Sequence, residues 1–171
     1  MSFDYTQADV FERLDSVAVF EALRAWQNGE VAPVHILQLR LLDAADRDQD
    51  LIRDVLLYEW VASTTIRRIC HFLSEAAAAD ALGQPETQAQ RLASFRAVMA
   101  EALDRENHAA AWVALHYRWV LPDGLPPGQM AEAAAISERH LRRLVRQGVR
   151  LLAQELRRAE LAAHRGGDDL S

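Results

Sequence analysis

The chain has almost no cysteine, because Cys70 is the only one in 171 residues. A single cysteine excludes an internal disulfide framework and any metal site built from several cysteines. No uncharged apolar stretch approaches the roughly 18 residues that a membrane-spanning helix needs, and no basic run precedes the first apolar positions. We therefore expect a cytoplasmic protein without a membrane contact or a secretory signal.

Lysine is absent, so all 19 basic residues are arginines, and the net charge of −6 is unevenly distributed. Residues 1–106 hold 10 arginines against 18 acidic residues, a balance of −8, whereas residues 107–171 hold 9 against 7, a balance of +2. Within residues 136–158, seven arginines face only Glu138 and Glu155. This asymmetry favours a module that binds a polyanion, attached to an acidic carrier.

No segment shows the alternation of apolar and polar residues that is typical of a β-strand, whereas apolar residues recur at helical spacing along the whole chain. We predict helices from an N-cap at Thr6 to Trp26, from Pro33 through Leu42, and over about 51–82, 86–104 and 107–120. After the loop LPDGLPPG we predict a short helix over 127–134, a turn at 135–137 and a long helix from 138 to about 163. The predicted fold is all-α, with an acidic helical bundle over 1–106, a helix-turn-helix domain over 107–163 and a flexible tail over 164–171.

The last predicted helix has one basic and one apolar side. At 100° per residue, its first five arginines fall within about 100° of one another, and apolar residues such as Leu141 and Val149 occupy the opposite side. Ser137 is suited to cap this helix. A helix of this kind can bury one side and present guanidinium groups to the major groove of DNA, where arginine binds guanine edges or phosphates. A solvated charged face is the alternative interpretation, and it stays open.

Within residues 107–161, a series of single residues and residue pairs occurs in the same order as in the motif of a known protein family. Arg118-Trp119-Val120 ends one helix, Gly124-Leu125 lies in the loop, and then come Met130-Ala131, Ala134, Ala135, Ile136-Ser137, His140-Leu141 and Val145. This order resembles region 4 of extracytoplasmic-function sigma factors and the helix-turn-helix of related bacterial regulators. The chain departs from that pattern at Ala135, where the family often has a glycine, and in a loop two residues longer. The first hundred residues do not resemble sigma region 2, so a complete sigma factor is not expected.

The resemblance and the basic side together imply a protein that binds double-stranded DNA and regulates transcription. The residues expected to contact DNA are Ser137, Glu138, Arg139, His140, Arg142, Arg143, Arg146 and Arg150. We expect a homodimer, because one helix-turn-helix contacts a single half-site. The N-terminal bundle is the favoured dimer surface, and Leu152, Leu156 and Leu161 form a second candidate. The alternative is a helical adaptor in a larger signalling or defence assembly, whose helix-turn-helix contacts a protein partner.

No catalytic constellation is apparent. The chain has no glycine-rich phosphate loop, and the six histidines show no pairing at three or four residues' spacing with one another or with Cys70. The acidic stretch DAADRDQD, residues 43–50, fits a solvated connection between helices better than a set of metal ligands. We therefore expect no enzymatic activity, no cofactor and no metal site.

Overall fold

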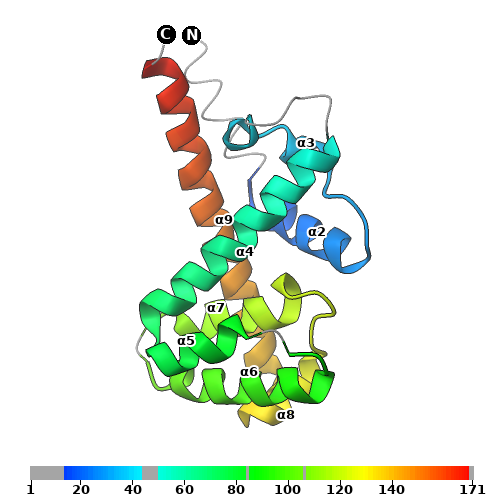
Figure 1. Ribbon diagram of the computed structural model, residues 1–171, viewed down its shortest axis with the longest axis vertical. Coiled ribbons are helices and arrows are strands. Elements are labelled where there is room, and N and C mark those ends of the chain that lie inside the picture. The colour runs from blue at the N-terminus through cyan, green and yellow to red at the C-terminus, as the bar shows by residue number, and fades with distance from the viewer. Residues whose placement is uncertain (1–13, 44–49, 84, 106, 170–171) are drawn as a thin grey trace. The chain divides into compact units, whose positions relative to one another are not determined.

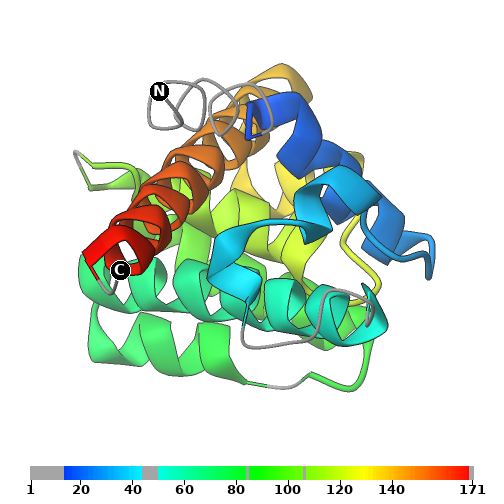
Figure 2. The same cartoon turned by 90° about the horizontal axis from the view of Figure 1, so that it is seen from above.

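The computed structural model describes residues 14–43, 50–83, 85–105 and 107–169, and over these ranges it contains helices and connecting loops but no strand (Figure 1, Figure 2). The predicted all-α class is confirmed. Contacts divide the chain into two compact units: unit 1 comprises Met1–Trp60 and Val149–Ser171, and unit 2 comprises Val61–Gly148. Helices α4 (Asp50–Phe72) and α9 (Glu138–Asp169) each run through a boundary between the units. Unit 2 holds residues on both sides of position 106, where we placed a domain boundary.

Helix α2 (Ser16–Gln27) opens the described part of unit 1. Its N-cap is Asp15, whose carboxylate accepts a hydrogen bond of 2.8 Å from the backbone N–H of Ala18. Because Asp15 has an extended backbone, with φ −75° and ψ 171°, the predicted single helix from Thr6 to Trp26 is wrong at this position. The expected cap at Thr6 lies outside the described residues.

A buried arginine organises the segment that follows α2. The predicted helix from Pro33 through Leu42 is instead α3 (Val34–Leu37) and a 3₁₀ turn, η1 (Arg40–Leu42), separated by extended backbone. From α4, the guanidinium of Arg53 donates to the carbonyl oxygens of Leu37, Leu39 at 2.7 Å and Leu42 at 3.0 Å. These bonds satisfy carbonyls that a continuous helix would have paired internally, so the segment can remain short and irregular.

A buried carboxylate joins η1 to the last turns of α9 within unit 1. Glu160 accepts hydrogen bonds from the backbone N–H groups of Arg40 at 3.0 Å and Leu41 at 2.9 Å, and its Oε2 lies 2.9 Å from Nε2 of His164. A carboxylate at the start of a helical turn satisfies N–H groups that have no partner within the turn. Helix α9 continues to Asp169, so residues 164–169, which we assigned to a tail, are helical.

In unit 2, the helix predicted over 51–82 is divided in two. Helix α4 ends at Phe72, and Ser74 caps α5 (Glu75–Leu82) by accepting a hydrogen bond of 3.2 Å from the N–H of Ala77. Ser74 also donates its backbone N–H and its hydroxyl to the two carboxylate oxygens of Glu101, at 2.7 Å and 2.5 Å. These bonds lower the pKa of Glu101 and hold the break between the helices in place.

Helix α6 (Gln88–Leu103) is the central element of unit 2. It begins with a capping box, in which Thr87 and Gln90 satisfy each other's backbone N–H groups. It packs against α5, against α7 (Ala109–Leu115) and against α8 (Pro127–Ala134), as Figure 1 shows. The side chains that fill this interior are fully buried and mostly large: Phe95, Val98, Met99, Trp112, Leu115, Met130 and Leu141.

Helix α7 passes into a π-helical turn, η2 (His116–Val120), whose first two side chains are buried. The hydroxyl of Tyr117 lies 2.6 Å from that of Ser94, which donates to the carbonyl oxygen of Asp80 at 2.9 Å. Burial raises the pKa of Tyr117. Neither ring nitrogen of His116 has a hydrogen-bond partner in the described part of the chain, and burial lowers its pKa to about 4, against a smaller opposite effect of the Ala81 carbonyl.

Candidate nucleic-acid interface

Helices α8 and α9 are joined by a tight turn whose geometry is well defined by hydrogen bonds. Ala135 adopts the left-handed conformation, with φ 56° and ψ 42°, and the N–H of Ile136 donates to the carbonyl oxygen of Ala131 at 3.1 Å. The hydroxyl of Ser137 accepts from the N–H of His140 at 3.0 Å, which makes Ser137 the N-cap of α9. The predicted boundaries of α8, of the turn and of the start of α9 are confirmed.

One side of the first turns of α9 is anchored in unit 2. Leu141 is fully buried, and Gly148 meets α7 so closely that a Cβ there would lie 2.6 Å from the carbonyl oxygen of Ala111 and 2.8 Å from Cβ of Leu115. Leu144 and Val145 are half-buried between these two contacts. The rotation of α9 about its own axis is therefore fixed within unit 2, which also fixes the direction of its opposite side.

The opposite side carries Arg139, Arg142, Arg143 and Arg146, which we call the basic face, and all four are exposed. Arg142 donates to Glu138 at 2.7 Å, an exposed pair within one turn. In the part of the chain that the structure describes, no ion pair involves the other three arginines. A shallow hollow of about 500 Å³ is lined by Glu138, Arg139, Arg142 and Arg146. Exposed guanidinium groups without carboxylate partners are available to an anion.

The remaining residues assigned to DNA contact have different environments. Ser137 and Glu138 are exposed at the start of α9, and His140 is half-buried. Arg150 is exposed on the same helix, but it follows the boundary at Gly148 and belongs to unit 1. The basic face is therefore defined within unit 2 without Arg150.

The structure adds Arg118 in η2, a residue that sequence reasoning did not include in the site. Its guanidinium carbon lies 4.0 Å from the centre of the Trp119 ring, a cation–π contact between neighbouring residues. Partial burial and the nearby positive charge of Arg142 both lower the pKa of Arg118. Arg142 itself is exposed and paired with Glu138, and an anion beside the half-buried Arg118 would relieve the repulsion between the two arginines. The only sequence signal was the position of Arg118 at the end of the helix before the loop.

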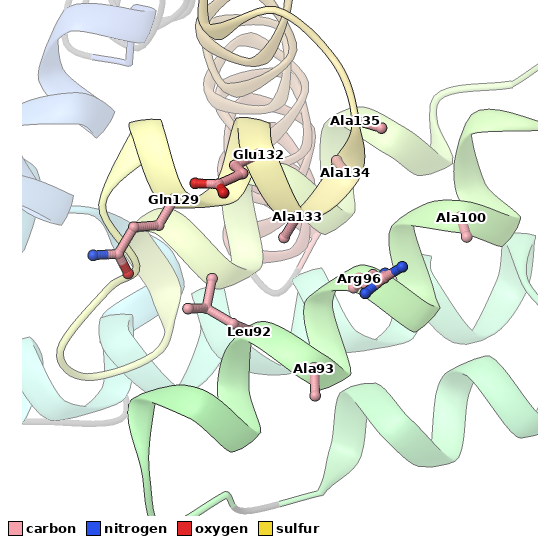
Figure 3. Close-up of a pocket in the computed structure, with 9 residues that line it drawn as sticks. All are labelled: Leu92, Ala93, Arg96, Ala100, Gln129, Glu132, Ala133, Ala134 and Ala135. Carbon is pink, nitrogen blue, oxygen red and sulfur yellow. The ribbon is translucent and has the colours of Figure 1, made fainter.

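A groove of about 670 Å³ is lined by α6 and α8 and reaches the turn that follows α8 (Figure 3). Helix α6 contributes Leu92, Ala93, Arg96 and Ala100, and α8 with the turn contributes Gln129, Glu132 and Ala133–Ala135. Five of the nine residues that line the groove are alanines. Figure 3 shows Gln129 near one end of the groove and Arg96 near the other. This lining offers no nucleophile with an adjacent base.

The described residues contain no group of three or more histidine, cysteine, aspartate or glutamate side chains placed to hold a metal ion. None of the helices in the described ranges is both long and apolar enough to cross a membrane. Cys70 is exposed on α4.

Comparisons with protein-family models, with curated proteins and with solved structures find no match to this chain. The resemblance of residues 107–161 to sigma region 4 therefore stays a prediction, supported by residue order alone.

Proposed function

We propose that this chain binds double-stranded DNA through the basic face of α9 and regulates transcription. The observation that carries the proposal is the row of exposed arginines on a helix whose other side is anchored in unit 2 and whose start is fixed by Ser137 and Ala135. Helices α8 and α9 then serve as the two helices of a helix-turn-helix, and the first turns of α9 enter the major groove. No enzymatic step, cofactor or metal is part of the proposal.

Each arginine of the basic face can make one of two kinds of contact with DNA. A guanidinium that reaches a guanine edge bonds it bidentately and reads sequence, whereas one that reaches a phosphate adds affinity for any sequence. We assign Arg118 to the second role, because its guanidinium is half-buried and lies near enough to that of Arg142 for the two positive charges to repel each other. The acidic residues elsewhere in the chain are repelled by phosphate, which favours approach through the basic face.

The first prediction concerns the basic face. Replacing Arg139, Arg142, Arg143 and Arg146 by alanine abolishes measurable DNA binding, because each base-reading arginine contributes about 1 to 3 kcal/mol. Single replacement of a phosphate-contacting arginine, Arg118 included, weakens binding to all sequences alike and lowers the slope of log K against log salt by about one. Fluorescence anisotropy with genomic fragments, the protein's own upstream region among them, measures both quantities over a salt titration.

Arg158→Ala is the matched control, since its side chain is 72% exposed on the same helix beyond the proposed contact, paired with Glu155. Its affinity for DNA should equal that of the parent. If the quadruple variant, folded by circular dichroism, binds DNA as the parent does, the proposal fails. A parent protein with no affinity for any fragment would favour the adaptor function, in which the same helices contact a protein partner.

The chain acts as a homodimer in this proposal, because two half-sites give the affinity that one helix-turn-helix lacks. Burial argues against the second candidate dimer surface, formed by Leu152, Leu156 and Leu161. Leu152 and Leu156 are buried, with 0% and 1% of their surface exposed, so they are not available to a second copy, and Leu161 is half-buried. The other candidate, in the N-terminal part of the chain, remains.

A further inference from the structure

Five exposed aliphatic residues of unit 1 come from two segments, the chain around the start of α3 and the first turns of α4. Between 42% and 70% of the surface of each is exposed. We call them the α4 apolar face: Val31, Val34, Leu51, Ile52 and Val55.

Helix α4 has a buried side and an exposed side, and both carry apolar residues. Arg53 and Leu57 are buried, whereas Leu51 and Val55, four residues apart, lie on the opposite side of the helix. The N–H of Ala32 donates to Oδ1 of Asp54 at 2.9 Å, and this bond places the backbone around Val31 and Val34 alongside the first turns of α4. The two exposed clusters therefore belong to one surface.

Hydrogen bonds keep this surface facing outward. Arg53 is bound to three carbonyl oxygens of the segment that runs from α3 to η1, and Asp54 also accepts from the indole N–H of Trp26 at 2.8 Å. Rotating α4 to bury Leu51 would break both sets of bonds, including the three that the buried guanidinium of Arg53 makes to carbonyl oxygens. Within the described residues of unit 1, a small rotation of α4 therefore cannot bury this surface.

We propose that a second copy of this chain covers the α4 apolar face, and that this contact forms the homodimer on which the proposed function relies. The five residues present on the order of 400 Å² per chain, since each is about half exposed and a fully exposed aliphatic residue presents roughly 160 Å². Two copies contribute on the order of 800 Å², about half of the ~1,600 Å² buried in a stable interface. That share matches the apolar fraction of typical interfaces, and the polar rim supplies the rest.

The rim of the face is acidic. Glu30 precedes Val31, Asp50 precedes Leu51, and Glu59 lies one turn beyond Val55, all three exposed. Two copies therefore bring like charges near each other, and salt screens that repulsion. Dimerisation should tighten as salt rises, whereas DNA binding weakens. A basic protein partner on the same face would show the opposite salt dependence.

Sedimentation velocity of the full chain without DNA tests the proposal separately from DNA binding. We expect the chain to dimerise with a dissociation constant below about 100 µM. This dissociation constant should decrease as the NaCl concentration is raised from about 50 to about 500 mM. Leu51→Glu with Val55→Glu weakens dimerisation at least about tenfold. Leu82→Glu is the matched control, because Leu82 is 56% exposed but belongs to unit 2, and it should leave the dimer unchanged.

Glu59→Gln provides a test in the other direction, since it keeps the shape of an exposed side chain and removes one rim charge. It should strengthen the dimer at low salt and reduce its salt dependence. A monomeric parent overturns the proposal, as does a dimer that the double variant, folded by circular dichroism, leaves intact. In either case DNA binding through the basic face would still be open to measurement.

Discussion

Gly148 is the residue whose identity the packing of unit 2 determines most directly. Alanine normally stabilises a helix interior relative to glycine by about 0.5 to 1 kcal/mol, but a Cβ at Gly148 would lie 2.6 Å from the backbone oxygen of Ala111. Backbone cannot move aside as a flexible side chain can, so α7 and α9 would have to separate. We predict that Gly148→Ala lowers the free energy of unfolding by about 1 to 3 kcal/mol, measured by urea denaturation.

Gly128→Ala is the control for this prediction. Gly128 lies in the first turn of α8 with no atom within 4 Å of an added Cβ, so alanine should be neutral or slightly stabilising there. Equal stability of the two variants would show that the contact between α7 and α9 is looser than the structure has it.

The residues that sequence reasoning placed correctly are those whose signal is local. Ser137 was identified as a cap because a small polar residue precedes a periodic apolar run, and the exposure of the basic face followed from helical spacing. Arg53 and Glu160 were missed, because nothing in the sequence distinguishes a buried charge from a surface one. Their partners lie at separations of 11 to 16 and about 120 residues, which only the fold brings together.

At the scale of elements, the errors fall where a capping residue interrupts an apolar periodicity that continues. The apolar spacing runs through Ser74 without a break, so the sequence predicts one helix where the structure has α4 and α5. The partner that holds the break, Glu101, is 27 residues away. Asp15 interrupts the first predicted helix in the same way. The cap at Ser74 is held by a tertiary partner, whereas Asp15 bonds the N–H of Ala18 three residues on. The end of α8 was marked locally by the turn before Ser137.

The turn between α8 and α9 carries the prediction that belongs to this scale. Ala135 has φ 56°, a conformation that costs an alanine roughly 1 kcal/mol and that glycine adopts freely. Ala135→Gly should therefore leave the free energy of unfolding unchanged or raise it by up to about 1 kcal/mol, since the gain is partly offset by the greater entropy of unfolded glycine. Thermal unfolding followed by circular dichroism is sufficient to see the sign.

Ala135→Val is the comparison variant, because a β-branched side chain tolerates positive φ worst. It should be less stable than the parent and should also bind DNA more weakly if the turn sets the direction of α9. A clear loss of stability in Ala135→Gly would mean that the turn is not left-handed at this position.

At the scale of the whole molecule, stability should depend on pH through a buried histidine in unit 2. His116 is 3% exposed, and its ring lies edge-on to that of Tyr117 at 5.1 Å. With a pKa of about 4 when folded and about 6.5 when unfolded, it binds a proton more readily in the unfolded state. The folded state is therefore favoured fully above pH 6.5, and that advantage is lost as pH falls toward 4.

The last prediction follows from this difference in proton binding. Between pH 7.5 and 5.5, the parent should lose about 1.4 kcal/mol of unfolding free energy through His116, and His116→Leu should lack that part of the slope. The interval avoids the range below about 4.5 in which Glu101, whose pKa is lowered by Ser74, begins to contribute a loss of its own. Urea denaturation at the two pH values measures the effect. At pH 7.5, His116→Leu should be at least as stable as the parent, because it removes two buried nitrogens that have no hydrogen-bond partner in the described part of the chain. A His116→Leu variant with the parent's full pH dependence would place the titrating group elsewhere in the molecule.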